Sequence, residues 1–219
     1  KLLNKGDFNT MTYPSDNHKF FVNNFSRVNT TPKSNLINSD GSVIMNLETA
    51  DLSALFESGY KFPETFKAKA DDGITDLYGV IYKPFDFDEN KKYPLLEYVY
   101  PGPQTESVNK SFSVRMDRLD RMAQLGFIVI TLGNRGGHPD RSKWYQNYGY
   151  GNLRDYGLAD KKYVAQQLAN RHDFIDINRV GIYGHSGGGF MSTAAILVYP
   201  DFFKVAYSQA GNHDNSIYN

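Results

Sequence analysis

The stretch that most constrains the fold is residues 179–192, which read Arg-Val-Gly-Ile-Tyr-Gly-His-Ser-Gly-Gly-Gly-Phe-Met-Ser. A short apolar run is followed by a glycine-framed turn and by the start of an apolar helix. Gly184, Ser186 and Gly188 form a G-x-S-x-G elbow, a strained strand-to-helix turn in which larger flanking side chains would collide with the strand and the helix. The pattern predicts an exposed Ser186 hydroxyl at a helix N-terminus, where free N–H groups favour a developing anion.

Two other interpretations of this glycine-rich turn are a purely structural turn and a phosphate-binding loop. A phosphate-binding loop requires the pattern G-x-x-x-x-G-K-[ST], and no lysine follows these glycines. The apolar strand before the turn and the helix after it favour the nucleophile elbow over a structural turn.

The composition excludes several classes of partner and cofactor. The 219 residues include 24 basic and 24 acidic side chains, so the formal net charge is zero and there is no basic stripe for nucleic acid. No apolar run is long enough for a membrane span. Cysteine is absent, which excludes thiolate catalysis and cysteine-based zinc sites. We therefore expect no metal, no cofactor and no nucleic-acid partner.

The first part of the chain has the pattern of an antiparallel meander. Apolar and polar residues alternate over residues 8–47, and turn-forming residues interrupt them at 14–17 and 40–41. Such a meander is too short to enclose a core of its own. We expect it to be the remaining edge of a larger β unit that begins before Lys1, followed by a helical or irregular connector over residues 51–59.

From residue 64 onward the pattern changes to that of an α/β sheet. Two β-rich runs, 64–70 and 75–83, are joined by the turn Asp71-Asp72-Gly73. Further strands are expected at 93–100, 127–132, around Val180 and at 204–210, with helices at 113–125, 155–171 and 188–199. Apolar strands alternating with helices predict a mostly parallel sheet covered on both faces. Two antiparallel strands before that sheet, with the elbow after its third parallel strand, give the order of the α/β-hydrolase fold.

A serine nucleophile in this fold needs two donors for the oxyanion that forms on its substrate. One donor is the N–H of the residue after the serine, here Gly187, and the other comes from the loop after the first parallel strand. That loop reads Val99-Tyr-Pro-Gly-Pro-Gln, and its two prolines have no N–H group. We therefore predict that the Tyr100 hydroxyl is the second donor; the alternative is that Tyr100 is a packed strand tyrosine.

Several motifs follow one another in an order that points to a known family. They are Asp72-Gly73, Tyr78-Gly-Val-Ile-Tyr-Lys-Pro, Tyr93-Pro-Leu-Leu, Val99-Tyr-Pro-Gly-Pro, Asn134-Arg-Gly and Gly184-His-Ser-Gly-Gly-Gly. Together they resemble the prolyl oligopeptidase family of serine peptidases, and its dipeptidyl peptidase IV branch most. The resemblance covers roughly residues 62–219, and the preceding meander is similar to the last blade of that family's β-propeller.

The resemblance implies a domain organisation. Residues 1–50 would be a partial last propeller blade, 51–61 a connector, and 62–219 an α/β-hydrolase catalytic domain truncated at its C-terminal end. By analogy with the family, the complete protein would be a homodimer located in the periplasm or secreted.

The resemblance also implies an activity and a site. The complete protein would be a serine exopeptidase that removes dipeptides from peptide N-termini through an acyl-enzyme, with a preference for Xaa-Pro or Xaa-Ala. Ser186 would be the nucleophile, Tyr100 and the Gly187 N–H the oxyanion hole, and Tyr218 would line the pocket for the penultimate residue.

Three positions depart from the motifs of the family. Pro101 stands where a small residue is usual, and Asn134 replaces the aspartate of an Asp-x-Arg-Gly motif. Gly187 replaces the common tyrosine after the nucleophile, which removes an aromatic wall from the pocket. A strict preference for proline is therefore left open.

The triad acid and base are not evident in this sequence. The order in this fold is serine, acid, histidine, and only one helix, one strand and a loop are predicted after Ser186. Asp201 precedes the last strand at the wrong end of the sheet, while His213 and its neighbour Asp214 come too early in the chain. We expect a fragment that is inactive in isolation, with the acid and base beyond Asn219, and with an apolar edge and face of the sheet left uncovered.

Three alternative functions remain open at this stage. An oligopeptidase or acylaminoacyl peptidase of the same family would lack the propeller glutamates that bind a free substrate amine, and no such pair is evident in this chain. A non-catalytic relative would use the domain for binding or assembly only. A general esterase is disfavoured by the Tyr-Pro-Gly-Pro loop, which differs from the His-Gly-Gly-Gly loop of esterases.

Overall fold

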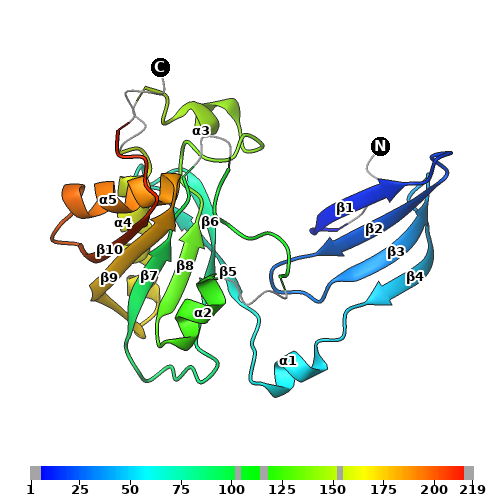
Figure 1. The fold of residues 1–219 in the computed structure, drawn as a ribbon, viewed down its shortest axis with the longest axis horizontal. Helices are drawn as coiled ribbons and strands as arrows, with labels where there is room; N and C mark the ends of the chain where they lie inside the picture. The colour runs from blue at the N-terminus through cyan, green and yellow to red at the C-terminus, as the bar shows by residue number, and fades with distance from the viewer. Residues whose placement is uncertain (1–5, 102–104, 114–117, 152–154, 215–219) are drawn as a thin grey trace. The chain divides into compact units, whose positions relative to one another are not determined.

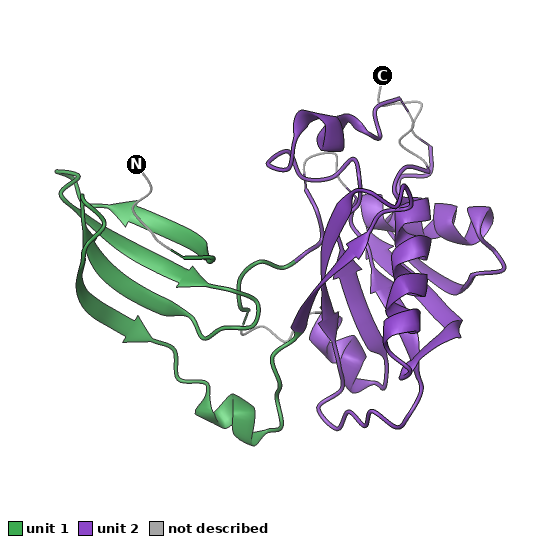
Figure 2. Cartoon of the chain, turned by 180° about the vertical axis from the view of Figure 1, so that it is seen from behind, with its two compact units in different colours: residues 1–63, 109–116 green, residues 64–108, 117–219 purple. Residues whose placement is uncertain are grey.

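The computed structural model describes residues 6–101, 105–113, 118–151 and 155–214. The chain forms two compact units, which Figure 2 shows in different colours. One unit comprises residues 1–63 with 109–116, and the other comprises 64–108 with 117–219. The domain limits expected at residues 50 and 61 stay predictions.

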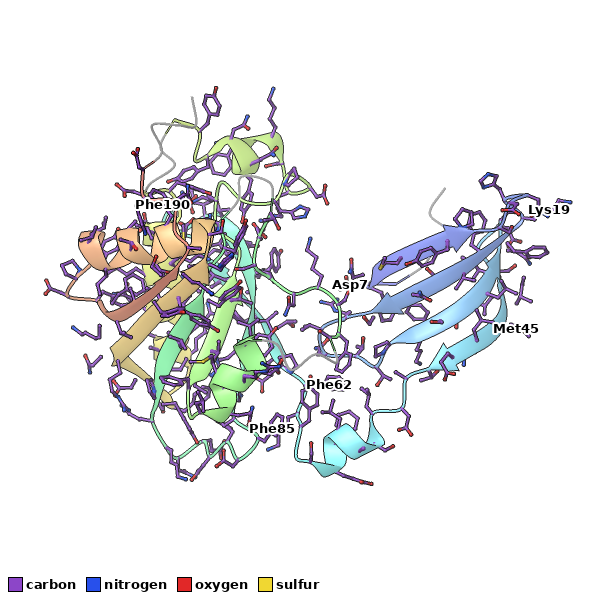
Figure 3. The ribbon with its side chains drawn as sticks, viewed as in Figure 1. Asp7, Lys19, Met45, Phe62, Phe85 and Phe190 are labelled. Carbon is purple, nitrogen blue, oxygen red and sulfur yellow. The ribbon has the colours of Figure 1, made fainter. Side chains whose placement is uncertain are left out.

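The smaller unit is a four-stranded antiparallel sheet. Its strands are β1 (Asn9–Pro14), β2 (Phe20–Ser26), β3 (Lys33–Asn38) and β4 (Val43–Thr49), paired in chain order. The short helix α1 (Ser53–Glu57) follows, within the segment that the sequence predicts to be a helical or irregular connector. Every residue of β4 is exposed, including Met45, which Figure 3 labels on that strand.

The larger unit is built on a six-stranded mixed sheet. Its strands are β5 (Glu64–Lys69), β6 (Asp76–Tyr82), β7 (Tyr93–Tyr98), β8 (Ile128–Leu132), β9 (Ile175–His185) and β10 (Phe203–Gln209). Their order across the sheet is β10-β9-β7-β8-β6-β5, so β7 lies between two strands that follow it in the chain. The pairs of β7 with β8, β7 with β9 and β9 with β10 are parallel, whereas β6 pairs antiparallel with both β5 and β8.

In the described part of the chain, four helices accompany this sheet (Figure 1): α2 (Arg118–Gln124), α3 (Lys143–Asn147), α4 (Leu158–Arg171) and α5 (Gly187–Val198). The core contains the apolar side chains of the central strands, among them Leu95, Ile130 and Ile182, packed with Val164 and Leu168 of α4. The fold prediction is confirmed: an α/β-hydrolase sheet follows an antiparallel meander of the propeller type.

Several element boundaries differ from the sequence predictions. The helix expected from residue 155 begins at Leu158, because residues 155–157 form turns and Gly157 has a left-handed φ of 77°. The helix expected from residue 113 does not include Ser113, which has no regular structure. The strand around Val180 begins earlier, at Ile175, where it extends the pairing with β7. Helix α3 was not predicted, because five residues carry too little periodicity to show it.

The sheet has one open face at the β10 edge. A largely apolar hollow of about 590 Å³ lies on this face. It is lined by alternate residues of β7 and β10, including Leu96, Tyr98, Val205 and Tyr207, and by Met122 of α2. Val205 and Tyr207 are 58% and 60% exposed. The opposite face of β7 is covered, because its Glu97 meets Lys161 of α4.

No helix within the described residues is long and apolar enough to cross a membrane.

Candidate active site

Ser186 lies at the apex of the turn between β9 and α5, as the elbow pattern predicts. Its backbone has φ 56° and ψ −119°, a conformation that non-glycine residues rarely adopt and that costs about 1 to 3 kcal/mol. Its N–H donates to the Gln209 carbonyl oxygen of β10 at 2.8 Å. This hydrogen bond, together with the close packing of the elbow glycines, holds the serine in its strained conformation at the carboxyl edge of the sheet.

The glycines of the elbow allow the end of β7 to pack directly against it. A Cβ at Gly188 or at Gly184 would overlap the carbonyl oxygen of Val99. Gly189 is similarly close to β10, because a Cβ there would lie 2.6 Å from the Gln209 carbonyl oxygen. Glycine is therefore required at Gly184 and Gly188 for the backbones to approach each other.

The N-terminus of α5 presents free amide groups beside the serine. The first hydrogen bond that closes the helix runs from the Phe190 N–H to the Ser186 carbonyl oxygen, at 3.0 Å. The N–H groups of Gly187, Gly188 and Gly189 come before it and have no partner within the helix. They can therefore donate to an anion at this position, and the helix dipole adds to the attraction.

The structure brings the predicted oxyanion residues Tyr100 and Gly187 to the same place. A Cβ at Gly188 would lie 3.5 Å from the Tyr100 Cα, and one at Gly187 would lie 3.8 Å from the Pro101 carbonyl oxygen. These distances place the start of the loop after β7 alongside the elbow, where Tyr100 is half-buried. Tyr218, the predicted pocket residue, lies outside the described residues.

No histidine of the described chain hydrogen-bonds to the Ser186 hydroxyl. His213 is exposed; its ring packs beside Gly211 and Phe190, and its Nε2 lies 3.5 Å from the Ser208 Oγ. His185 is half-buried, and its Nδ1 has no hydrogen-bond partner among the described residues. His172 follows the C-terminus of α4 and stacks on Phe174.

The other candidate groups lie away from the elbow or lack the geometry of a site. His18 lies in the turn between β1 and β2, and His138 pairs with Asp140 of the same loop at 3.4 Å. Asp201 precedes β10, whereas the elbow meets the end of that strand. In the part of the chain that the structure describes, no group of three His, Asp or Glu side chains could hold a metal ion.

An ionic cluster around the buried side chains of Arg135 and Asp160 was not predicted from the sequence. Arg135 donates from both its Nε and its Nη2 to the Asp160 carboxylate, at 3.1 and 2.6 Å, and its Nη1 lies 3.1 Å from Asp72. Burial raises the pKa of Asp72, but hydrogen bonds from Thr75 and Ile74 and the charge of Arg135 outweigh it and lower that pKa to about 2. The cluster joins the β5–β6 turn, the loop after β8 and α4.

A second buried pair, Glu97 and Lys161, lies between β7 and α4. Both side chains are almost fully buried, and the Glu97 Oε1 lies 3.7 Å from the Lys161 Nζ, beyond hydrogen-bonding distance. Lys161 donates instead to the Leu132 carbonyl oxygen, at 2.6 Å. Burial raises the pKa of Glu97 to about 7, although Lys161 opposes the shift, and burial lowers the pKa of Lys161.

Comparison with known proteins shows which protein family shares the segment that contains the elbow. The model of the prolyl oligopeptidase family matches residues 112–219, the segment that contains the elbow. Residues 112–219 belong to the prolyl oligopeptidase family. The family resemblance expected from the motifs is thereby confirmed, including its dipeptidyl peptidase side, to which the relatives below belong by name.

Human dipeptidyl peptidase 8 is 40% identical over 152 residues, which are 69% of this chain and 17% of that relative. A protein of Paracoccidioides lutzii named probable dipeptidyl-aminopeptidase B is 36% identical over 118 residues, which are 52% of this chain and 12% of the relative. A crystal structure from Bacteroides ovatus, described as a candidate dipeptidyl aminopeptidase IV, superposes with a TM-score of 0.78 at 30% identity. It covers 90% of this chain, which spans 28% of the solved one.

This chain therefore spans less than a third of the length of the family members that it matches. The family and the relatives' names support a serine peptidase of the dipeptidyl peptidase type.

Proposed function

We propose that this chain supplies the nucleophile of a serine exopeptidase that releases dipeptides from the N-termini of peptides. The observation that carries the proposal is the strained Ser186, set between β9 and the N-terminus of α5. Strain of this kind is characteristic of functional sites, where the surrounding structure holds a residue in an unfavourable conformation. The names of the relatives support the proposed substrate class.

In the proposed reaction, the Ser186 Oγ attacks the carbonyl carbon of the second residue of the peptide; the base takes the hydroxyl proton and passes it to the leaving amine. The Gly187 N–H and the Tyr100 hydroxyl stabilise the negative charge on the carbonyl oxygen. The amine of the remaining peptide leaves, and water then hydrolyses the acyl-enzyme to release the dipeptide. A preference for proline or alanine at the second position, with Tyr218 in its pocket, is part of the same proposal.

The base that activates Ser186 is proposed to be a histidine outside residues 1–219. All five histidines of this chain are described, and none hydrogen-bonds to the serine hydroxyl. The triad acid is likewise proposed to lie outside residues 1–219. The complete protein is further proposed to act as a homodimer outside the cytoplasm, by analogy with the family.

The test uses the full-length protein and a fluorophosphonate probe. We expect a mass increase of one probe in the wild type and none in Ser186→Ala, while Ser58→Ala, which changes an exposed serine of the smaller unit, stays labelled. The same proteins are assayed with a dipeptide anilide, with its N-blocked form and with a short acyl ester.

Each pattern of results has a definite meaning. Hydrolysis of the free dipeptide anilide alone supports the exopeptidase. Equal hydrolysis of the blocked form would indicate an oligopeptidase or acylaminoacyl peptidase, and faster hydrolysis of the ester would indicate an esterase. A full-length wild type that is neither labelled nor active would refute a catalytic role.

A further inference from the structure

The loop that follows β7 is anchored to the protein at both of its described ends. At its start, Tyr100 and Pro101 pack alongside the elbow. At its far end, Glu106 and Ser107 contact β8, the loop after β8, and α3. Residues 102–104 lie outside the described part. The attachment of Glu106 and Ser107 therefore restricts the conformations of the loop, which begins with Tyr100, the proposed oxyanion donor.

The Glu106 carboxylate is held by a buried tyrosine of α3. The Tyr145 hydroxyl donates to the Glu106 Oε1 at 2.6 Å, and Tyr145 is only 2% exposed. The backbone of Tyr145 is fixed in turn, because its N–H donates to the Ser142 Oγ at 3.1 Å and its carbonyl oxygen accepts from the Gly136 N–H at 2.7 Å. The Arg141 guanidinium lies 4.3 Å from the centre of the Tyr145 ring.

The same carboxylate lies directly on the backbone of the loop after β8. A Cβ at Gly133 would lie 2.7 Å from the Glu106 Oε2, and one at Gly137 would lie 2.6 Å from its Cγ and Oε1. Only glycines leave room for the acid at these two positions. Glu106 therefore fills a space that α3 and the loop after β8 form together.

Ser107 adds a second attachment, to the buried strand β8. The Thr131 Oγ1 donates to the Ser107 carbonyl oxygen at 2.7 Å, so the 2.8 Å contact between the two hydroxyls is a donation from Ser107 to Thr131. Thr131 is fully buried. Glu106 and Ser107 thus fix adjacent positions of the loop by side-chain and backbone groups.

We propose that Glu106 is a positioning residue for the oxyanion hole: by fixing the far end of the loop, its carboxylate holds Tyr100 against the elbow. Glu106 itself does not touch the reacting atoms. This inference rests on the proposed function, because it assigns a role to Tyr100 as a donor. It predicts that the loss of Glu106 acts through Tyr100 and through kcat, because an oxyanion donor acts in the transition state.

The test measures kcat and KM of the full-length protein on a dipeptide anilide. We expect Glu106→Ala to lower kcat about 10- to 100-fold with little change in KM, the scale of a misplaced catalytic group. Glu106→Gln keeps an acceptor for the Tyr145 hydroxyl and should stay near the wild-type rate. Tyr145→Phe keeps the packing but removes the donor, so it should lower kcat in part. Glu89→Ala, at an exposed glutamate of the β6–β7 loop, is the control and should be unchanged.

The decisive measurement combines Glu106→Ala with Tyr100→Phe. Alone, Tyr100→Phe should lower kcat by about 100- to 1,000-fold if it removes an oxyanion donor. With Glu106→Ala already present, its effect should be smaller by at least about tenfold, because the two residues act through one loop. If Glu106 had only a structural role, the reductions in kcat caused by Glu106→Ala and by Tyr100→Phe would multiply in the double variant.

The outcomes separate this inference from the proposed function. An active wild type with multiplying losses, or with full activity in both Glu106→Ala and Tyr145→Phe, would overturn the positioning role alone. If Glu106→Ala does not fold, the same double-variant comparison with Tyr145→Phe decides the matter. A full-length wild type that is inert, as is Ser186→Ala, would refute the proposed function and the positioning role with it.

Discussion

Glu97 should make the stability of this protein fall between pH 5 and pH 8, and replacing it with glutamine should remove that dependence. Its carboxyl group is fully buried between the central strands and α4, and its oxygens have no hydrogen-bond partner among the described residues. The ammonium group of Lys161, 3.7 Å away, only partly offsets the cost of burying a charge.

The direction of this pH dependence follows from the raised pKa of Glu97. Burial moves the pKa of Glu97 from 4.5 to about 7 in the folded protein, while the unfolded chain keeps the lower value. Well below pH 4.5 the group is protonated in both states, so it contributes no pH dependence there. As the pH rises toward 7, the unfolded state loses its proton first, so folding stability falls by about 1.4 kcal/mol per pH unit. From pH 5 to pH 8 the loss attributable to Glu97 is about 3 kcal/mol at most.

The assay is urea-induced unfolding of the full-length protein and of Glu97→Gln at pH 5 and pH 8. Burial and the nearby charge of Lys83 also lower the pKa of His172, so the quantity to compare is the difference in stability between the two proteins. Glu97→Gln should be less stable than the wild type at pH 5 and should recover relative to it by pH 8. The exposed Glu89→Gln should follow the wild type. An identical pH dependence in all three proteins would refute the assignment of a raised pKa to Glu97.

Two further predictions concern the elbow. Ser186→Gly should unfold at a higher temperature than Ser186→Ala, with a gain of about 1 kcal/mol, because only glycine relieves the positive φ; equal melting temperatures would show that the turn is unstrained. Gly188→Ala should destabilise the protein by about 3 kcal/mol, because its Cβ would overlap the Val99 carbonyl oxygen. The Cβ of Gly187→Ala would have no atom nearer than 3.8 Å, so the stability of this variant should lie within about 0.5 kcal/mol of the wild-type value. Similar urea midpoints for these two variants would contradict the close packing of β7 on the elbow.

The order of elements and the elbow were accessible from the sequence because both depend on neighbouring residues. Apolar runs of strand length, the alternation of the meander and the glycines around Ser186 are local patterns, and they predicted the strands, most of the helices and the turn. The exact ends of the strands and helices were harder to predict from the sequence. Strand β9 starts at Ile175 because β7 pairs with it there, and α4 starts after the left-handed Gly157.

The contacts that support the site could not be predicted in this way. Glu97 occurs in a mostly apolar strand, and nothing near it in the sequence indicates that Lys161 of α4 would meet it between the helix and the sheet. The sequence places Arg135 only within a family motif; its bidentate pairing with Asp160 depends on where α4 crosses the sheet. Glu106 likewise finds Tyr145 only because the loops after β7 and β8 lie at the same edge.

The sequence by itself determined the local conformations of this protein, including a serine held in a turn that only flanking glycines allow. The tertiary structure alone decided which distant charges are buried together and which loops support the serine. The physical reason is that turns and strands depend on the steric and apolar preferences of neighbouring residues. Buried ion pairs and loop contacts depend instead on the strand order, which places β7 between β8 and β9.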